Sequence, residues 1–128
     1  MAWVPDQQKN SIDLTEGETQ LISYQGNRVW MTRVSNLQKQ QLTMLSSLVH
    51  QDTGCDVSQE TCFVQSETDR QGILLLYLKE KPDVLSKNQE WFGGFLNPAT
   101  NAVYDLLGRG YLSNPTDSPK TVFFKQGK

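Results

Sequence analysis

Two cysteines and one histidine are the residues in this sequence best suited to metal or redox chemistry. Cys55 and Cys62 lie in a polar segment, and His50 precedes them. A structural zinc ion or an iron–sulfur cluster takes four ligands, and these residues do not complete such a set. The spacing also differs from the Cys-x-x-Cys of redox dithiols. We therefore expect a local disulfide between Cys55 and Cys62 in an oxidising compartment, with two free thiols as the alternative.

Residue types and spacing give little support for catalysis. The single histidine falls at the end of a predicted helix and the cysteines fall in a separate loop, so no nucleophile is paired with a base. Glu80 and Asp83 are close in sequence beside Pro82, but nothing around them predicts the burial typical of catalytic carboxylates. We expect that the protein is not an enzyme.

Length and composition indicate one soluble-type domain. The chain has 128 residues, of which 37% are hydrophobic and 20% charged, and its net charge is -2. This balance argues against a nucleic-acid surface and against a polybasic patch for anionic lipid. The longest apolar run, residues 73–78, is far shorter than the roughly 20 residues of a membrane-spanning helix. We expect a single domain over residues 1–128, with an extended lead-in over residues 1–17 and no membrane insertion by this segment.

Short strands separated by turns dominate the pattern. Strands are predicted at 19–24 and 28–34, joined by a Gly26-Asn27 turn. A capping box formed by Ser35 and Gln38 predicts a helix over about residues 35–50, and a long polar loop follows over 52–71. The remaining predicted strands cover residues 73–78, 90–96, 102–105 and 121–125. The fold class is therefore mostly β, with small stacked sheets, one helix and a long loop.

Residues 92–109 read Phe-Gly-Gly-Phe-Leu-Asn-Pro-Ala-Thr-Asn-Ala-Val-Tyr-Asp-Leu-Leu-Gly-Arg. This stretch resembles the second cluster-binding box of Rieske iron–sulfur proteins, which reads approximately Phe-Gly-Gly-Trp-Phe-Cys-Pro-Cys-His-Gly-Ser-x-Tyr-Asp-x-x-Gly-Arg. The two align without a gap, and the shared residues include Gly93, Gly94, Pro98, Tyr104, Asp105, Gly108 and Arg109. The preceding hairpin and helix are similar to those of the iron–sulfur subunit of bacterial quinol–cytochrome c reductases. The resemblance spans about residues 12–125 and implies Rieske-like stacked antiparallel sheets.

The residues that hold the cluster in that family are replaced in this sequence. A Rieske cluster needs two thiolates on one iron and two imidazoles on the other. In the shared register the first-box ligands fall on Leu78 and Glu80, and the second-box ligands fall on Asn97 and Thr100. Leucine has no lone pair, asparagine and threonine are weak neutral ligands, and one carboxylate does not hold a sulfide-bridged iron pair. We therefore expect no cluster, no other cofactor or metal, and no electron transfer.

Other cluster-supporting positions of the family have changed as well. The family's extra disulfide cysteines would fall on Asp83 and Ala99. The serine that donates a hydrogen bond toward the cluster is Ala102 here, although its tyrosine partner is present as Tyr104. This sequence thus keeps the turn residues of the motif but lacks its cluster ligands.

The resemblance implies two non-redox functions. The first is a structural or interaction subunit with a protein partner near a membrane respiratory complex, in the periplasm, anchored through a segment outside this sequence. The second is a binding module whose former cluster tip recognises a peptide, a small polar ligand or a hard cation such as calcium. The predicted recognition tip consists of Glu80, Asp83, Asn97, Thr100 and Asn101.

Overall fold

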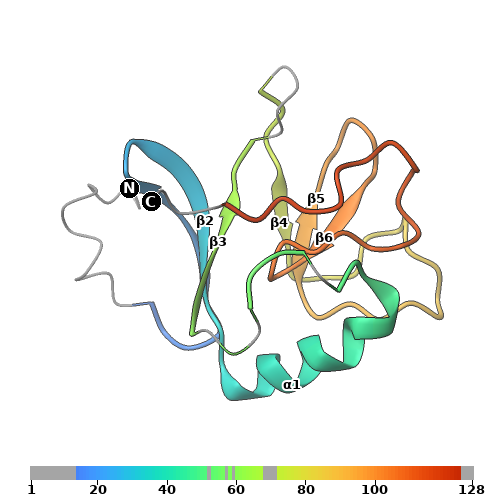
Figure 1. The fold of residues 1–128 in the computed structure, drawn as a ribbon, viewed down its shortest axis with the longest axis horizontal. Coiled ribbons are helices and arrows are strands. Elements are labelled where there is room, and N and C mark those ends of the chain that lie inside the picture. Colours follow the sequence, from blue (N-terminus) through green and yellow to red (C-terminus); the bar gives the residue numbers. More distant parts are fainter. Residues whose placement is uncertain (1–13, 52, 57, 59, 68–71, 125–128) are drawn as a thin grey trace.

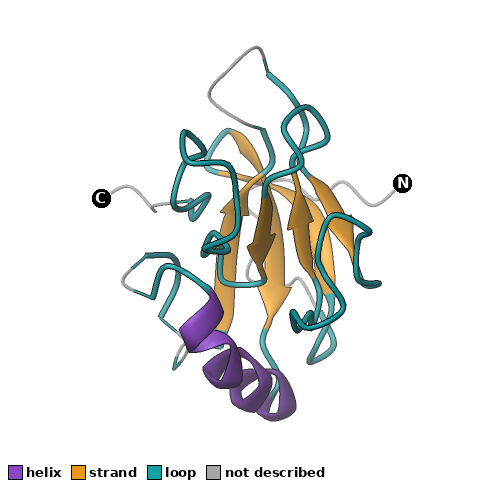
Figure 2. Ribbon diagram, turned by 90° about the vertical axis from the view of Figure 1, so that its right-hand side faces the viewer, coloured by secondary structure: helices purple, strands orange, loops and turns teal. Residues whose placement is uncertain are grey.

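The protein is described here by a computed structural model covering residues 14–51, 53–56, 58, 60–67 and 72–124, so most of the predicted lead-in over residues 1–17 lies outside the described residues. Two antiparallel sheets of three strands each form the domain (Figure 1). Figure 2 shows the α-helix across one end of the strands. The described part of the chain is mostly β, as the sequence predicts.

The first sheet has the order β1-β2-β3 and begins with a hairpin. Strand β1 (Thr19–Tyr24) pairs with β2 (Asn27–Arg33), and Tyr24 lies opposite Asn27. The predicted hairpin is confirmed, but its turn is Gln25-Gly26, one residue earlier than expected. Gln25 and Gly26 both have positive φ, 53° and 80°. Two successive left-handed residues match the right-handed twist of paired strands, which is why hairpins favour them.

Strand β3 (Thr61–Gln65) lies inside the segment that the sequence predicts to be a polar loop. It pairs with β2, and Cys62 lies opposite Thr32. Phe63 packs on one face of the sheet, while Cys62 and Val64 belong to the core on the other face. The prediction of a loop over 52–71 is wrong in this part because the strand is short and its partner is distant in the sequence.

Helix α1 (Asn36–Met44) starts at the predicted capping box. The backbone N–H of Gln38 donates to Ser35 Oγ at 3.1 Å, and the backbone N–H of Ser35 donates to Gln38 Oε1 at 3.0 Å. The chain then tightens into a 3-10 helix, η2 (Leu45–Leu48). The α-helix is therefore shorter than the predicted span of residues 35–50.

The helix covers the core with a narrow face. Leu42 and Leu45 are fully buried, whereas Leu37 and Met44 are 62% and 65% exposed. Leu37 and Met44 are therefore the apolar side chains of α1 that the core does not cover.

The second sheet has the order β4-β5-β6. Its strands are β4 (Leu76–Leu78), β5 (Gly94–Leu96) and β6 (Val103–Asp105), all shorter than predicted. Within the described residues, the predicted strand at 121–125 forms only isolated bridges, such as that between Arg109 and Thr121.

Aromatic side chains join the two sheets. The rings of Trp30, Tyr77 and Phe95 lie 5.8 to 5.9 Å apart in tilted pairs. Nε1 of Trp30 donates a hydrogen bond to the carbonyl oxygen of Leu75 at 3.2 Å. Since Trp30 belongs to β2 and Phe95 to β5, this cluster fixes the sheets against each other.

Candidate functional site

The turn between β5 and β6 is built around Asn97, whose side chain is buried. Its Oδ1 accepts a hydrogen bond from the backbone N–H of Ala99 at 2.9 Å. Its backbone N–H donates to the carbonyl oxygen of Ala102 at 2.8 Å, and Asn101 adopts a positive φ of 66°. Asparagine favours such turns because its side chain bonds to the backbone two residues further on. Asn97 therefore has a structural role in shaping the turn.

A cavity of about 330 Å³ lies beside this turn. Its size is at the lower end of the roughly 300–1,000 Å³ typical of small-molecule pockets. Ile73, Pro119 and Val122 form the apolar part of its wall. The polar side chains of the wall include Gln65, Asn97, Thr100, Tyr104, Asp117 and Ser118. The cavity is thus bounded by β3, the 97–102 turn and the segment over residues 117–122.

Hydrogen-bonding groups on the cavity wall are only partly used. Ser118 Oγ is buried and has no hydrogen-bond partner among the described residues. The Tyr104 hydroxyl donates to the carbonyl oxygen of Pro119 at 3.0 Å, and its oxygen can still accept. Burial raises the pKa of Tyr104 to about 12, so the hydroxyl stays protonated at neutral pH. The Ser118 hydroxyl would reach a polar group placed inside by rotation of its side chain, and the Tyr104 oxygen has an acceptor site left.

The lining carries few ionisable groups. Among the described residues that line the cavity there is no histidine, cysteine or lysine, and Asp117 is its one ionisable group besides Tyr104.

The structure does not bring the two predicted ligand boxes together. Leu78 lies opposite Gly94, and Leu76 lies opposite Leu96, so the end of β4 adjoins the beginning of β5. Asn97 follows β5 at the opposite end of this pairing. In Figure 1 the yellow loop over residues 79–92 and the orange turn over residues 97–101 accordingly leave opposite ends of the sheet.

The five residues of the predicted recognition tip therefore fall into two groups. Glu80 and Asp83 follow β4 at one end of the sheet, whereas Asn97, Thr100 and Asn101 form the turn at the other end. The physical reason is the antiparallel register, in which successive strands reverse direction. Asn97 and Thr100 line the cavity, and Glu80 and Asp83 do not. Within the described ranges, no three His, Cys, Asp or Glu side chains lie together as metal ligands would.

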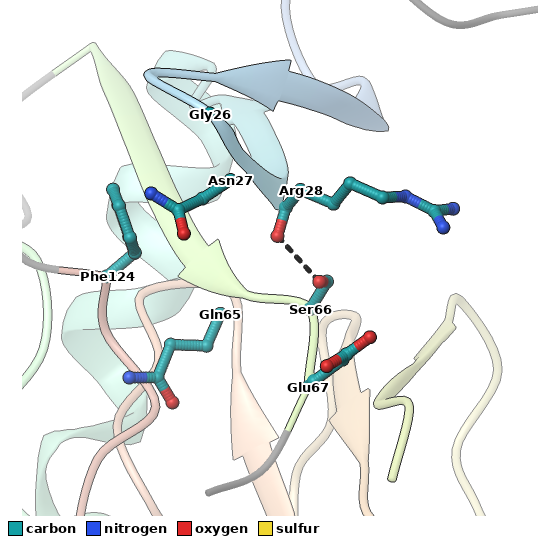
Figure 3. A pocket seen from close by; sticks show the side chains of 7 residues that line it. All are labelled: Gly26, Asn27, Arg28, Gln65, Ser66, Glu67 and Phe124. Atoms are coloured by element: carbon teal, nitrogen blue, oxygen red, sulfur yellow. Dashed lines mark hydrogen bonds between the residues drawn. The ribbon is translucent and has the colours of Figure 1, made fainter. Parts of the chain in front are cut away.

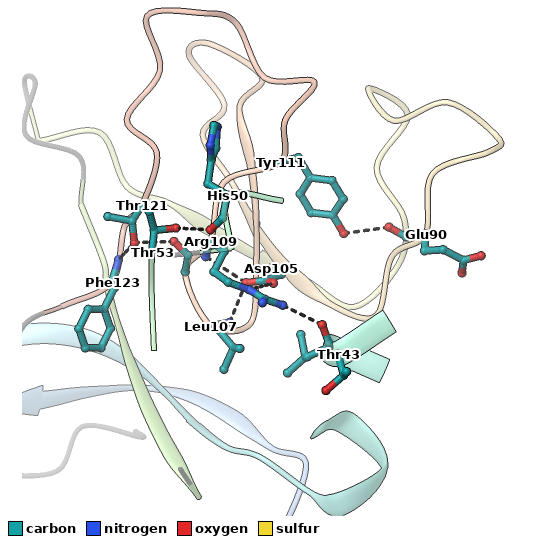
Figure 4. Close-up of polar contacts among 12 residues, drawn as sticks. Thr43, His50, Thr53, Glu90, Asp105, Leu107, Arg109, Tyr111, Thr121 and Phe123 are labelled. Carbon is teal, nitrogen blue, oxygen red and sulfur yellow. Dashed lines mark hydrogen bonds and ion pairs between the residues drawn. The ribbon is translucent and has the colours of Figure 1, made fainter. Parts of the chain in front are cut away.

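The Asp-x-x-Gly-Arg part of the motif forms a buried ion-paired turn (Figure 4). Asp105 Oδ2 lies 2.8 Å from Arg109 Nε, and Asp105 Oδ1 accepts from the backbone N–H groups of Leu107 and Arg109 at 2.9 and 3.0 Å. Burial raises the pKa of Asp105, while the Arg109 guanidinium and the backbone donors oppose that shift. These motif residues hold the fold together, because they are sealed from solvent and bind each other.

The two cysteines meet in the core, away from the cavity. Cys55 and Cys62 are both buried as free thiols, and their side chains hydrogen-bond to each other. The disulfide between them stays a prediction. Neither cysteine lines the cavity beside Asn97.

A second hollow, of about 340 Å³, lies beside the β1–β2 turn. Its lining includes Asn27, Gln65, Glu67 and Phe124, and Ser66 Oγ closes one side by donating to the carbonyl oxygen of Arg28 at 2.6 Å. Figure 3 shows the Arg28 side chain extending away from the other lining side chains. We regard the first cavity as the candidate site, because the buried Ser118 hydroxyl without a partner among the described residues belongs to its lining.

Comparison with known proteins leaves the family open. The chain matches no protein-family model and no curated protein. The resemblance to Rieske proteins therefore rests on the sequence motifs, above all the one over residues 92–109. No helix in the described part of the chain is long and apolar enough to cross a membrane.

Sequence reasoning identified two lining residues, Asn97 and Thr100, and missed the others. Gln65 lies in strand β3, which the sequence did not predict. Ser118 lies three residues after Pro115, and a turn there does not tell which part of the fold Ser118 will contact. Only the folded arrangement places Ser118 beside Asn97, and no local pattern could have shown it.

Proposed function

We propose that this protein is a redox-silent binding domain that holds a small polar ligand, or a polar side chain of a peptide, in the cavity beside residues 97–102. The observation behind the proposal is Ser118 Oγ, which is buried at the wall without a partner among the described residues. An unsatisfied buried polar group costs about 1–3 kcal/mol. A ligand that draws the Ser118 hydroxyl toward the cavity by rotation of the side chain removes this cost, and Asn97 and the Tyr104 hydroxyl can fix the ligand's orientation.

A hard cation suits this cavity less well than an uncharged polar ligand. Calcium takes about six to eight oxygen ligands, usually with several carboxylates. Asp117 is the only carboxylate among the described residues of the lining. Glu80 and Asp83, which the cation hypothesis requires, follow β4 at the far end of the sheet.

The redox-silent part of the proposal rests on the residues at the ligand-equivalent positions. Leu78, Glu80, Asn97 and Thr100 replace two thiolates and two imidazoles. Anaerobically purified protein should contain no stoichiometric iron, and its visible spectrum should show no chromophore that reductant bleaches. Iron near one cluster per chain together with such a chromophore would refute this part.

Ligand binding can be tested by amide NMR with a panel of small amides, alcohols and free amino acids. Binders should shift the backbone signals of residues 97–102 and 117–122. Ser118→Ala removes one hydrogen bond to the ligand and should weaken binding about fivefold to tenfold. Ser47→Ala is the matched control, since Ser47 is exposed and lies on η2. A panel without shifts at the cavity, or equal affinity for both variants, contradicts the proposal.

The Ser118→Ala variant also separates a ligand site from a merely hydrated one. If the hydroxyl is unsatisfied in the free protein, its removal should leave the free energy of unfolding unchanged or raise it by about 1 kcal/mol. A loss of stability of that size would mean that the hydroxyl is already bonded, for example to water.

A second candidate function is that of a structural or interaction subunit near a membrane respiratory complex in the periplasm. The observation that favours a protein partner is the exposed apolar pair Leu37 and Met44, both on α1. Replacing both with glutamine should abolish co-purification with membrane proteins, and Gln40→Ala, also on α1, is the control. If the Leu37→Gln/Met44→Gln variant and the Gln40→Ala variant recover the same amount of a respiratory partner, the Leu37 and Met44 side chains do not form the contact.

A further inference from the structure

The buried side chains of Cys55 and Cys62 lie next to each other, although Cys62 belongs to β3 and Cys55 to the segment that contacts the β6 turn. Cys62 lies in β3 and is 1% exposed, and Cys55 lies in the preceding segment and is 4% exposed. Their thiols hydrogen-bond to each other, and Cys55 Sγ also donates to the carbonyl oxygen of Thr61 at 3.8 Å. A disulfide needs its two sulfurs side by side, and this arrangement supplies that condition.

We propose that Cys55 and Cys62 are an oxidative modification site, closing into one intramolecular disulfide when the protein meets a disulfide oxidant, and that this bond fastens the segment around Cys55 to β3. The proposal goes beyond ligand binding, because neither cysteine lines the cavity. It also does not depend on the Rieske resemblance.

The segment that holds Cys55 is fixed to the second sheet. The backbone N–H of Cys55 donates to the carbonyl oxygen of Leu107 at 2.8 Å, in the turn that follows β6. Gly54 allows this close approach: its φ is +82°, and a Cβ there would lie 2.5 Å from the Leu107 oxygen and 2.7 Å from Arg109 Cγ. Backbone so close to backbone leaves no room for a side chain.

Cys62 belongs instead to the first sheet, where it lies opposite Thr32 of β2. A bond between Cys55 and Cys62 would therefore run from a segment seated on the β6 turn to the β1-β2-β3 sheet. The bond would hold this segment in place against β3, while its contact with the β6 turn stays a hydrogen bond from Cys55 to Leu107.

The two thiols have different chemical roles in this reaction. The hydrogen bond from Cys62 lowers the pKa of Cys55, whereas burial raises the pKa of Cys62. The thiolate is the nucleophile in thiol–disulfide exchange, so Cys55 attacks first. Because both sulfurs are buried, attack requires the segment around Cys55 to open locally from the Leu107 turn.

The reaction balances with a disulfide as oxidant. Cys55 thiolate attacks one sulfur of oxidised glutathione, forming a mixed disulfide and releasing one glutathione thiolate. Cys62 then loses its proton and attacks the Cys55 sulfur, forming the protein disulfide and releasing a second glutathione thiolate. The protein loses two electrons and two protons, and the glutathione disulfide gains them as two thiols.

The test is to incubate the folded chain with oxidised glutathione and to count free thiols after denaturation in acid. We expect both thiols to disappear, the intact mass to fall by two hydrogens, and the chain to stay monomeric. Mild denaturant should speed the reaction, since it favours the local opening. Two free thiols after prolonged exposure, or disulfide-linked dimers instead of monomer, would overturn the proposal.

Single variants test the assigned order of attack. Cys62→Ser should stop at a stable mixed disulfide on Cys55, because no resolving thiol is left. Cys55→Ser should stay essentially unmodified under the same conditions. The reverse pattern, with the glutathione adduct on Cys62, contradicts the assignment of Cys55 as the first nucleophile.

Stability provides a readout of the link itself. A short loop closed by an unstrained disulfide should raise the Tm of the oxidised chain by roughly 10 °C over the reduced chain. The Cys55→Ser/Cys62→Ser double variant, treated with the same oxidant, should show no shift. An oxidised chain that melts at or below the Tm of the reduced chain would overturn the inference that the bond fastens the segment around Cys55 to β3.

Discussion

Nη2 of Arg109 donates a hydrogen bond to the carbonyl oxygen of Leu42 at 2.8 Å. Leu42 lies in the last turn of α1, where carbonyl groups lack enough helical donors and carry partial negative charge. The same guanidinium is ion-paired with Asp105, the last residue of β6. One arginine therefore connects the helix, the ion-paired turn and the second sheet.

Removing this arginine should be among the most damaging single changes in the core. Arg109→Met leaves the buried Asp105 carboxylate without its cation, and we expect a loss of about 3–5 kcal/mol in the free energy of unfolding. Urea denaturation followed by circular dichroism measures it. Arg28→Met, at an exposed position, is the control and should change stability by less than about 0.5 kcal/mol. A double variant with Asp105→Asn should lose less than the two single changes combined, and additive losses would contradict the pairing.

Asn114 completes the outer edge of β6 with its side chain. Its Oδ1 accepts from the backbone N–H of Val103 at 2.9 Å, and its Nδ2 donates to the Val103 carbonyl oxygen at 2.8 Å. Asn114→Ala should cost about 1–3 kcal/mol, since two backbone groups lose a partner. Asn27→Ala loses one exposed bond, to the carbonyl oxygen of Gln25, and should cost less. Thermal unfolding of both variants compares them, and equal losses would exclude the edge role.

Tyr104 should make the fold sensitive to alkali. Burial raises its pKa from 10.0 to about 12, so the folded protein holds the phenolic proton more tightly than the unfolded chain. Stability should therefore be unaffected below about pH 10 and should fall as the pH rises from there to about 12, by up to roughly 2–3 kcal/mol.

Tyr104→Phe should flatten this alkaline decline while costing about 1–2 kcal/mol at neutral pH, because the carbonyl oxygen of Pro119 loses its donor. Urea midpoints measured across the alkaline range give both quantities. Tyr111, whose pKa burial also raises, supplies the decline that the variant should retain. An unchanged pH profile in the variant would show that Tyr104 does not titrate as described.

Gly94 is required by close packing rather than by backbone conformation. A Cβ on Gly94 would overlap the carbonyl oxygen of Tyr104 and approach Trp91 Cη2 to 2.9 Å. Gly94→Ala should destabilise the fold by more than about 2 kcal/mol, because the β5–β6 backbones must move apart. Gly26→Ala is the comparison: its φ of +80° strains an alanine by about 1 kcal/mol, but nothing lies within 4 Å. Chemical denaturation should rank the two variants in this order, and the opposite ranking would contradict the packing explanation.

Local signals in the sequence predicted the local structure well. The hairpin follows from short segments rich in β-branched and aromatic residues around a glycine turn, and α1 begins where Ser35 and Gln38 form a capping box. Both depend on residues within a few positions of each other. Strand β3 was missed because Cys62, Phe63 and Val64 form a short apolar run whose partner is the distant strand β2.

The candidate site was less predictable because it is assembled from distant segments. Asn97 and Thr100 were identified through a motif, but Ser118 and Gln65 reach the cavity only through tertiary packing. The two ligand boxes were expected to meet at one tip. They do not, because strand direction fixes which end each loop leaves, and the sequence does not reveal the direction in which β4 pairs with β5.

The contact of Trp30 with Leu75 also gives the protein an internal optical reporter. The Trp30 indole lies between the sheets, with its N–H bonded across the interface and its ring against Tyr77 and Phe95. Indole emission shifts to longer wavelength when its ring enters water. Any event that parts the two sheets should therefore redden the fluorescence of Trp30.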